Sequence, residues 1–327
     1  MNTFGKNYRI SIFGESHGAC VGATLDGVPA GLELDFDLIA GESARRAPGR
    51  DEFSTPRTEA DDWKILSGVR DGKATGAPLT AIIENKNTRS GDYHNEILRP
   101  GHADISAYYK FGGNSDMRGG GQFSGRLTAP LVFAGAIAKQ VLATHGITIT
   151  SEIKDEAALK ERTITAKEKD DSVGGIITCT AAGVPPGLGE PFFDSFESVL
   201  SHLLFSVPAV KGVEFGAGFA LANMTGSQAN DSLYYENDRI KARTNHNGGV
   251  QGGITTGASD IVFSTVIKPT PSIGLEQFTV NTETKENVKH TIKGRHDPCI
   301  VFRARPVIEA CAAIVLLDFI LEKGKTQ

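Results

Sequence analysis

The order of the short strand-like and helix-like segments most constrains this fold, because the two kinds do not alternate regularly. Five runs rich in apolar and β-branched residues predict strands: Arg9–Phe13, Val21–Leu25, Leu79–Glu84, Gly175–Ala181 and Ile261–Ile267. Four segments with apolar residues at three- and four-residue spacing predict helices: Asp35–Arg46, Ser124–His145, Phe192–Phe205 and Pro306–Leu321. Regular alternation would favour a parallel sheet, so this order predicts an α+β fold with largely antiparallel strands.

One short pattern occurs twice in the chain. Gly-Val-Pro-Ala-Gly-Leu at 27–32 and Gly-Val-Pro-Pro-Gly-Leu at 183–188 each follow a predicted strand and precede a predicted helix. A repeated strand-turn-helix unit explains the pattern, and two unrelated Pro-Gly turns are the alternative, since such turns are common. The polar segment 154–171 is expected to be a charged surface excursion rather than a linker. We therefore expect residues 1–327 to form a single domain with an internal duplication.

Composition excludes several classes of protein. With 39% apolar and 22% charged residues over 327 positions, the chain is typical of a globular protein rather than a disordered one. Its 38 glycines predict many turns and backbone close to a ligand. The 34 Lys and Arg against 39 Asp and Glu give a net charge of -5, so no general basic surface is available for nucleic acid or an anionic membrane.

The location of the protein is predicted from what the sequence lacks. The first ten residues carry no apolar stretch of the kind found in signal peptides, and the apolar segments 129–138 and 310–321 are too short for a membrane span. Four cysteines are scattered without a Cys-x-x-Cys pair, which argues against a zinc site and a disulfide scaffold. We expect a cytoplasmic protein with no metal and no membrane or nucleic-acid partner.

A histidine stands in a glycine-flanked turn directly after the first predicted strand. The segment Gly14-Glu15-Ser16-His17-Gly18 presents an imidazole that can exchange a proton near neutral pH, and a structural histidine is the alternative. A hydrolase triad is excluded, because adjacent residues on one turn do not face one another in the required geometry.

Arginines gather at the end of the first predicted helix. Arg45-Arg46-Ala47-Pro48-Gly49-Arg50 places three guanidinium groups in six residues, which suits phosphate and carboxylate oxygens. A solvated cap at the helix C-terminus is the alternative. Because the chain is acidic overall, a small polyanionic ligand explains the cluster better than nucleic acid does.

A second group of polar segments lies before the apolar helix at 124–145. Arg99 to Asp104 contains His102, and three glycines at 119–121 predict an anion cradle at a helix N-terminus with Ser124 as the N-cap. The Gly-Lys-Ser/Thr ending of a Walker loop is absent. His102 and Asp104 have no third ligand at a spacing that suits a metal.

Three further turns carry polar groups. The glycine-dense segment 245–253 and Lys268-Pro269-Thr270-Pro271-Ser272 offer backbone N–H groups, a cation and hydroxyls that suit a phosphate. The segment 294–299 places Asp297 shortly before the last helix. For each of these turns an ordinary loop is the alternative.

Together, in this order and over nearly the whole chain, these segments resemble the chorismate synthase family. The resemblance rests on eight segments: 14–18, 45–49, 99–104, 118–126, 183–191, 245–253, 268–272 and 295–299. It implies a β-α-β sandwich, with a helical layer between two antiparallel sheets, and a homotetramer.

The resemblance also implies a reaction. The family uses reduced FMN to convert 5-enolpyruvylshikimate 3-phosphate into chorismate and phosphate, a 1,4-elimination without net redox change that belongs to the shikimate pathway and aromatic amino acid biosynthesis. The chain would then be a phosphate-lyase. Some members reduce their flavin with NADPH and others use an external source, and no motif here decides between them.

By position, the resemblance assigns roles to particular residues. His17 would protonate the departing phosphate, His102 would protonate the flavin ring, and Asp297 would manage the proton at flavin N5. The substrate phosphate and carboxylates would be bound by Arg45, Arg46, Arg99, Arg126 and Arg295. Flavin contacts would come from Gln122, Phe123, Ser124, Pro208, Ala209, Gly252, Lys268, Pro269, Thr270, Pro271, Ser272 and Arg295. These residue types fit the chemistry, because a phosphate leaves more easily when it is protonated or paired with cations.

The sequence departs from the family pattern at the glycine run. Where the family usually has Gly-Gly-Gly-Arg-Ser-Ser-Ala-Arg-Glu-Thr, this chain has Gly-Gly-Gly-Gln-Phe-Ser-Gly-Arg-Leu-Thr at 119–128. An arginine common after the Arg45 cluster aligns with Glu52, near Arg50, and an Asn-Ala pair is replaced by Pro208-Ala209. These changes leave three hypotheses open: an active chorismate synthase with a rebuilt flavin pocket, another flavin-dependent elimination, and a non-catalytic binding or assembly subunit.

Overall fold

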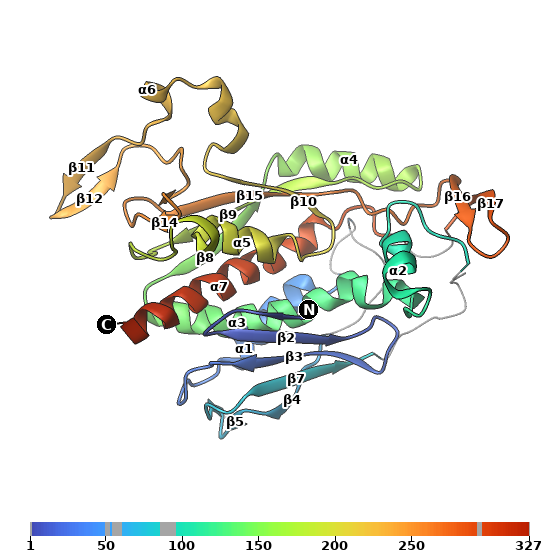
Figure 1. Cartoon of the computed structure of the whole chain (residues 1–327), viewed down its shortest axis with the longest axis horizontal. Coiled ribbons are helices and arrows are strands. Elements are labelled where there is room, and N and C mark those ends of the chain that lie inside the picture. Colours follow the sequence, from blue (N-terminus) through green and yellow to red (C-terminus); the bar gives the residue numbers. More distant parts are fainter. Residues whose placement is uncertain (1, 50–52, 54–60, 86–95, 293–295, 327) are drawn as a thin grey trace.

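Two antiparallel sheets with helices between them make up the centre of the molecule (Figure 1). The computed structural model describes residues 2–49, 53, 61–85, 96–292 and 296–326. The expectation of a mixed fold with antiparallel strands is confirmed, because the named strand pairs are antiparallel.

The first sheet has the strand order β1-β2-β3-β7-β4. Its strands are β1 (Thr3–Phe4), β2 (Arg9–Gly14), β3 (Cys20–Asp26), β4 (Lys64–Ser67) and β7 (Leu79–Glu84). Two short strands, β5 (Val69–Arg70) and β6 (Lys73–Ala74), form a hairpin between β4 and β7.

The second sheet has the order β10-β15-β9-β8. Its strands are β8 (Thr148–Ile153), β9 (Gly175–Ala182), β10 (Val210–Phe215) and β15 (Ile261–Ile267). Alternate residues of β9 and β15 are buried against the helices, as expected for a sheet with one covered face.

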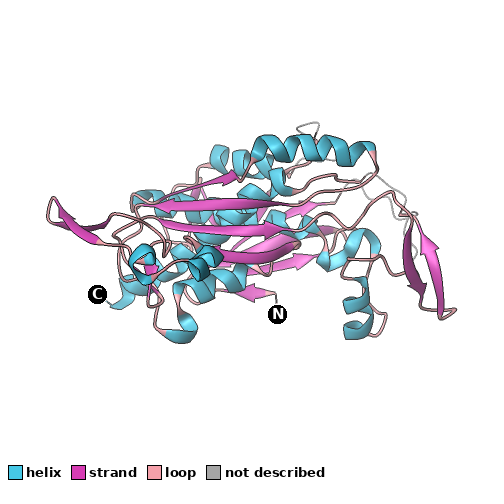
Figure 2. Ribbon diagram, turned by 90° about the horizontal axis from the view of Figure 1, so that it is seen from above, coloured by secondary structure: helices cyan, strands magenta, loops and turns pink. Residues whose placement is uncertain are grey.

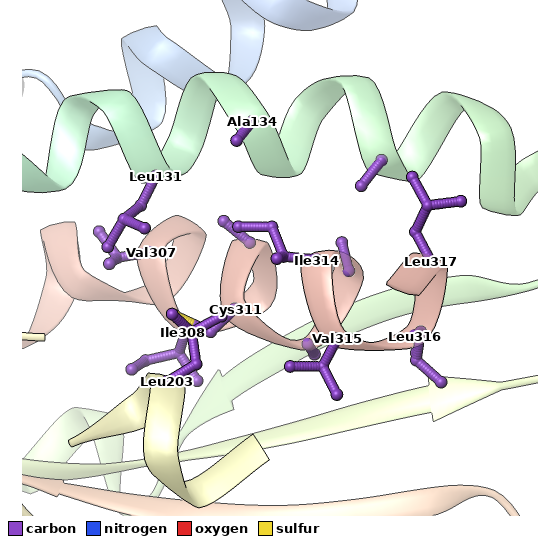
Figure 3. Packing of buried hydrophobic residues seen from close by; sticks show 14 of the residues in the cluster. Leu131, Ala134, Leu203, Val307, Ile308, Cys311, Ile314, Val315, Leu316 and Leu317 are labelled. Carbon is purple, nitrogen blue, oxygen red and sulfur yellow. The ribbon is translucent and has the colours of Figure 1, made fainter. Parts of the chain in front are cut away.

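Helices α3 (Thr128–Thr144) and α7 (Val301–Thr326) lie between the two sheets (Figure 1). Figure 3 shows their packing, with Leu131 of α3 facing Val307 of α7, and Leu203 of a third helix below α7. A Cβ atom on Gly135 would lie 2.3 Å from the Cβ of Ala310, so glycine permits the close approach of the two helices. Residues 129–138 of α3 are all buried, and this part of the helix is apolar around its whole circumference.

Shorter helices complete the core and its edges. Helix α1 (Phe36–Arg46) packs against α3 and α7, and α5 (Phe196–Leu204) packs against α7. Helices α2 (Asp104–Phe111), α4 (Glu156–Glu168) and α6 (Gly226–Ala229) lie outside this layer (Figure 1). Short 3₁₀ segments cover Arg118–Phe123, Gly125–Leu127, Phe192–Asp194 and Gly218–Asn223, and the first of them is interrupted by the non-helical Gly119, Gly120 and Gly121.

Two hairpins extend from opposite ends of the molecule (Figure 2). They are β11–β12 (Leu233–Glu236 and Arg239–Ala242) and β16–β17 (Gln277–Asn281 and Glu286–His290). A smaller hairpin, β13–β14 (Val250–Gln251 and Ile254–Thr255), precedes β15.

Several helix bounds differ from the sequence expectations. The last helix begins at Val301, five residues before Pro306, because a proline near a helix start costs only one backbone donor when packing compensates for it. The predicted helix Phe192–Phe205 is divided into a 3₁₀ turn and α5. The segment 154–171, expected to be a charged surface excursion, contains helix α4, which buries Leu159, Thr163 and Ala166 at a helical spacing.

Candidate active site

The loop that carries His17 lies at one end of the first sheet. It connects β2 to β3 and packs against the turn at 119–121, with the Ser16 N–H donating to the Gly121 carbonyl at 3.1 Å. A Cβ atom on Gly119 would lie 2.6 Å from Nε2 of His17, at a backbone φ of +62°. Only glycine therefore lets this turn pass beside the imidazole.

The glycine turn differs in part from the predicted helix N-terminal cradle. Ser124 does act as an N-cap, since its hydroxyl accepts from the Arg126 N–H at 3.3 Å, but the helix it caps is the 3₁₀ turn Gly125–Leu127 that leads into α3. Helix α3 itself begins only at Thr128. In the structure the glycines contact the His17 loop, and the helix start lies further along the chain.

One buried carboxylate binds two of the predicted substrate arginines. Asp61 accepts from Arg46 through both oxygens, at 2.6 Å from Nε and 2.9 Å from Nη2, and also accepts from Nη1 of Arg126. The Asp61 side chain is fully buried, and those of Arg46 and Arg126 are 5% and 7% exposed. The two cations thus share one counter-ion in an environment of low dielectric constant.

Asp297 joins the same group of charges through Arg303, in the first turn of α7. Nη1 of Arg303 donates to Asp297 Oδ2 at 2.6 Å, and its Nε donates to the backbone carbonyl of Arg46 at 3.0 Å. Burial is the main effect that lowers the pKa of Arg303; Asp297 raises this pKa, and the nearby Arg46 lowers it further. We call Arg46, Asp61, Arg126, Asp297 and Arg303 the arginine–aspartate cluster.

Asn85 connects this cluster to the His17 loop. Its amide oxygen accepts from Nε of Arg126 at 3.3 Å, and its amide nitrogen donates to the carbonyls of Glu15 and Gly18 at 2.9 and 3.0 Å. The carbonyls on both sides of His17 are therefore held by a side chain that also contacts Arg126. The structure brings the predicted residues His17, Arg46, Arg126 and Asp297 together in one connected region.

His102 lies in a second group, formed by Arg99, His102, Asp104, Lys268 and Ser272, which we call the His102 group. Arg99 forms a bidentate pair with Asp104, both hydrogen bonds measuring 2.8 Å. Nε2 of His102 is 3.2 Å from the Ser272 hydroxyl, and Lys268 donates to the Gly101 carbonyl at 2.6 Å. Burial, followed by the charge of Arg99, lowers the pKa of His102 to about 4, so its imidazole is neutral at pH 7.

Part of the predicted flavin-binding set lies beside the His102 group. The Lys268 N–H donates to the Ala209 carbonyl at 2.9 Å, next to Pro208. The hydroxyl oxygen of Thr270 is buried and has no hydrogen-bond partner within the part of the chain that the structure describes. The segments 208–209 and 268–272, far apart in sequence, therefore meet at the end of β15 where β10 begins.

Other predicted contacts lie elsewhere. Gln122 is exposed, and the ring of Phe123 is 6.3 Å from that of Phe111 at the end of α2. Gly252 is in the β13–β14 hairpin, at the end of β15 opposite Lys268, and a strand of that length spans about 20 Å. Among the described residues, one chain does not bring Gly252 to the predicted flavin contacts at 208–209 and 268–272. Arg295, Arg50 and Glu52 lie outside the described residues.

Arg45 belongs to a different group of charges inside the helical layer. Its guanidinium donates to Glu309 at 2.6 and 2.7 Å and to Glu42 at 2.8 and 3.0 Å. Lys139 donates to both carboxylates, and Ser151 donates to Glu309 at 2.6 Å. Burial would raise the pKa of Glu309, but the hydrogen bond from Arg45 and the charge of Lys139 lower it to about 2. Glu42, Arg45, Lys139, Ser151 and Glu309 form what we call the helical-layer network.

Three residues of the site, Asp61, Asn85 and Arg303, were not predicted from the sequence. They carry no glycine-rich or arginine-rich motif, and each contacts residues distant in sequence. A weak signal existed for Asn85, which directly follows the strand β7 at the sheet end that also carries the His17 loop. Within the described residues, no group of three or more His, Cys, Asp or Glu side chains is placed to hold a metal ion.

Comparison with known proteins gives one consistent result. A model of the family described as chorismate synthase matches residues 8–321. A chorismate synthase of Chitinophaga pinensis is 50% identical over 335 aligned residues, covering 100% of this chain and 98% of the relative. That of Methanocaldococcus jannaschii is 43% identical, covering 99% and 97%. A crystal structure of a chorismate synthase superposes with a TM-score of 0.74 at 28% identity, covering 98% of this chain and 93% of the other.

Proposed function

Since this chain belongs to the chorismate synthase family, we propose how its own residues carry out the family's reaction with reduced FMN as cofactor. The enzyme is a phosphate-lyase that eliminates phosphate from 5-enolpyruvylshikimate 3-phosphate to give chorismate. The alternative of a non-catalytic subunit has no support from the comparisons. The residue roles, the identity of the cofactor and the assembly are our proposals.

The placement of His17 next to the arginine–aspartate cluster carries the proposal. Among the described residues, that cluster gathers three guanidinium groups around two carboxylates. Guanidinium groups of this kind suit the phosphate and carboxylates of the substrate. A cationic site beside a proton donor is what departure of a phosphate requires.

We assign the proton for the departing phosphate to His17. Asn85 holds the carbonyls of Glu15 and Gly18, which fixes the loop and therefore the position of the imidazole. Arg46 and Arg126 would stabilise the negative charge that develops as the carbon–oxygen bond breaks. Asp297, held by Arg303, would hold or accept the proton removed from the substrate ring.

The residues around His102 fit a phosphorylated cofactor. Lys268 supplies a cation, while Ser272 and Thr270 supply hydroxyls, and the buried Thr270 hydroxyl still lacks a partner within the described residues. Bound reduced FMN would supply the electron chemistry of the elimination. The family resemblance assigns to His102 the protonation of the flavin ring. Because its pKa is lowered to about 4, we propose that the neutral imidazole donates or accepts one hydrogen bond there without adding a charge.

The assembly is also proposed. We propose a cytoplasmic homotetramer, in which Gly252 of one subunit could contact the flavin bound by another subunit. Within one chain this residue lies at the opposite end of β15 from the His102 group.

Two reductants for the flavin are considered, NADPH and an external source. Arg99 and Arg295 remain proposed substrate contacts, whereas the contacts of Arg45 with Glu42 and Glu309 favour a structural role for it over the predicted substrate contact. Gln122, Phe123 and Ser124 remain proposed flavin contacts.

We further propose that the single domain is a duplicated unit arranged as the family's β-α-β sandwich. The strand orders β2-β3-β7-β4 and β8-β9-β15-β10 support this, because corresponding strands hold the same places in the two sheets. The turns at 27–32 and 183–188 also correspond. Gly31 and Gly187 each donate to a short hairpin, at 2.8 Å in both cases.

The test is an anaerobic assay with purified protein, 5-enolpyruvylshikimate 3-phosphate and chemically reduced FMN, in which phosphate and chorismate are followed together. We expect equal release of both products, and no release with oxidised FMN. FMN binding without product would indicate another substrate. No FMN binding would contradict the proposed cofactor and revive the non-catalytic alternative.

A further inference from the structure

Asp61 occupies the centre of the arginine–aspartate cluster, although no motif pointed to it. Its carboxylate is fully buried and accepts hydrogen bonds from both Arg46 and Arg126. Two buried guanidinium groups repel each other, and a shared carboxylate removes most of that repulsion. Asp61 thereby determines how far apart the two cations lie and which way they point.

The contacts of Asp61 form part of a longer chain of hydrogen bonds. On one side, Arg126 contacts Asn85, which holds the carbonyls of Glu15 and Gly18 around His17. On the other side, the carbonyl of Arg46 accepts from Arg303, which binds Asp297. The series links the loop of one proposed proton-handling residue to the other, and Asp61 is the member that both arginines share.

We propose that Asp61 is a positioning residue, which orients Arg46 and Arg126 for the departing phosphate without touching the substrate itself. This inference rests on the proposed function of the site. Because both guanidinium groups are already oriented by a buried carboxylate, they need little reorganisation when the phosphate charge develops.

The substitution Asp61→Asn tests this, since it keeps the shape of the side chain and removes its charge. We expect kcat to fall roughly a hundredfold, the cost of a small misplacement of catalytic groups, with a much smaller change in KM. Inorganic phosphate, titrated by calorimetry, should bind at least as tightly as to the wild type, because a negative charge beside the arginines is gone. A merely structural defect would weaken both turnover and phosphate binding.

Asp318→Asn is the matched control. Asp318 is also a buried carboxylate with several hydrogen bonds, to the N–H groups of Lys6 and Tyr8 among others, but it lies toward the far end of α7. If this variant showed the same loss of kcat, the effect of Asp61→Asn would be general destabilisation and the proposal would be overturned. Near-normal kcat in Asp61→Asn, or a parallel loss of phosphate affinity, would overturn it as well.

A second variant covers the case in which Asp61→Asn does not fold. Asn85→Ala breaks the neighbouring link in the series, and we expect a loss in kcat of roughly five- to tenfold from the hydrogen bonds removed. Unchanged kcat would contradict the linked arrangement. If the wild type itself showed no turnover, the proposed function would fail, while the phosphate titration of Asp61→Asn would still decide the role of Asp61 because it needs no flavin.

Discussion

Arg45 and Arg46 are neighbours at the end of α1, yet they belong to charged groups of two different kinds. Arg45 joins the helical-layer network, in which Arg45 and Lys139 donate to Glu42 and Glu309, and Ser151 also contacts Arg305. Arg46 joins the arginine–aspartate cluster, which Asn85 connects to the His17 loop. The first group lies among the helices, whereas the second contacts the loop of a proposed proton donor. This difference in neighbours separates a structural role from a binding role.

Removing the charge of Glu309 should have the largest effect on stability. In Glu309→Gln, Arg45 and Lys139 lose a carboxylate that is only 2% exposed, and breaking a buried ion pair costs about 3–5 kcal/mol. We expect that decrease in the free energy of unfolding, measured by urea denaturation, while kcat per folded molecule stays near normal. A stable variant with impaired turnover would mean that the helical-layer network takes part in catalysis.

Matched substitutions at positions 45 and 46 test the comparison directly. Arg46→Lys keeps the positive charge but loses the bidentate contact with Asp61, and we expect kcat/KM to fall roughly 10²–10³-fold, as when one transition-state donor is removed. Arg45→Lys should mainly lower stability. If Arg45→Lys instead raised KM for the substrate, Arg45 would be a substrate ligand, as the family resemblance implies.

The His102 group extends the comparison to pH. Burial, together with the charges of Arg99 and Lys268, lowers the pKa of His102 from its ordinary value near 6.5 to about 4. Between these values the unfolded chain binds a proton that the folded chain does not, so the free energy of unfolding should decrease as pH falls from about 6.5 toward 4. His102→Gln should flatten this dependence in urea titrations between pH 5 and 7.

The exposed His145 provides a control for that experiment. His145→Gln removes one imidazole from the surface end of α3 and leaves the His102 group intact. If wild type and His102→Gln lost stability equally over this pH range, His102 would have an ordinary pKa, and the effect assigned to its burial and to the nearby cations would be wrong.

Much of the fold could be predicted from local sequence. β7 (Leu79–Glu84) and β15 (Ile261–Ile267) have the predicted bounds, and α1 begins one residue after the predicted start. The spacing of apolar residues predicts where these elements begin and end, because each element buries at least one face against the core. The start of α7 was misplaced because the proline rule describes exposed helices, whereas packing compensates for the bond that Pro306 lacks.

The sequence by itself determined the family, the class of fold and most of the residues that we propose for chemistry, because these depend on motifs of neighbouring residues. Only the tertiary structure decided which charges meet. Asp61 and Arg303 lie far from Arg46 in the sequence, and ion pairs between distant segments leave no local pattern. Arg45 and Arg46 are the same residue type in one short motif, so the sequence does not distinguish them. On a helix their side chains point about 100° apart, and they contact different partners.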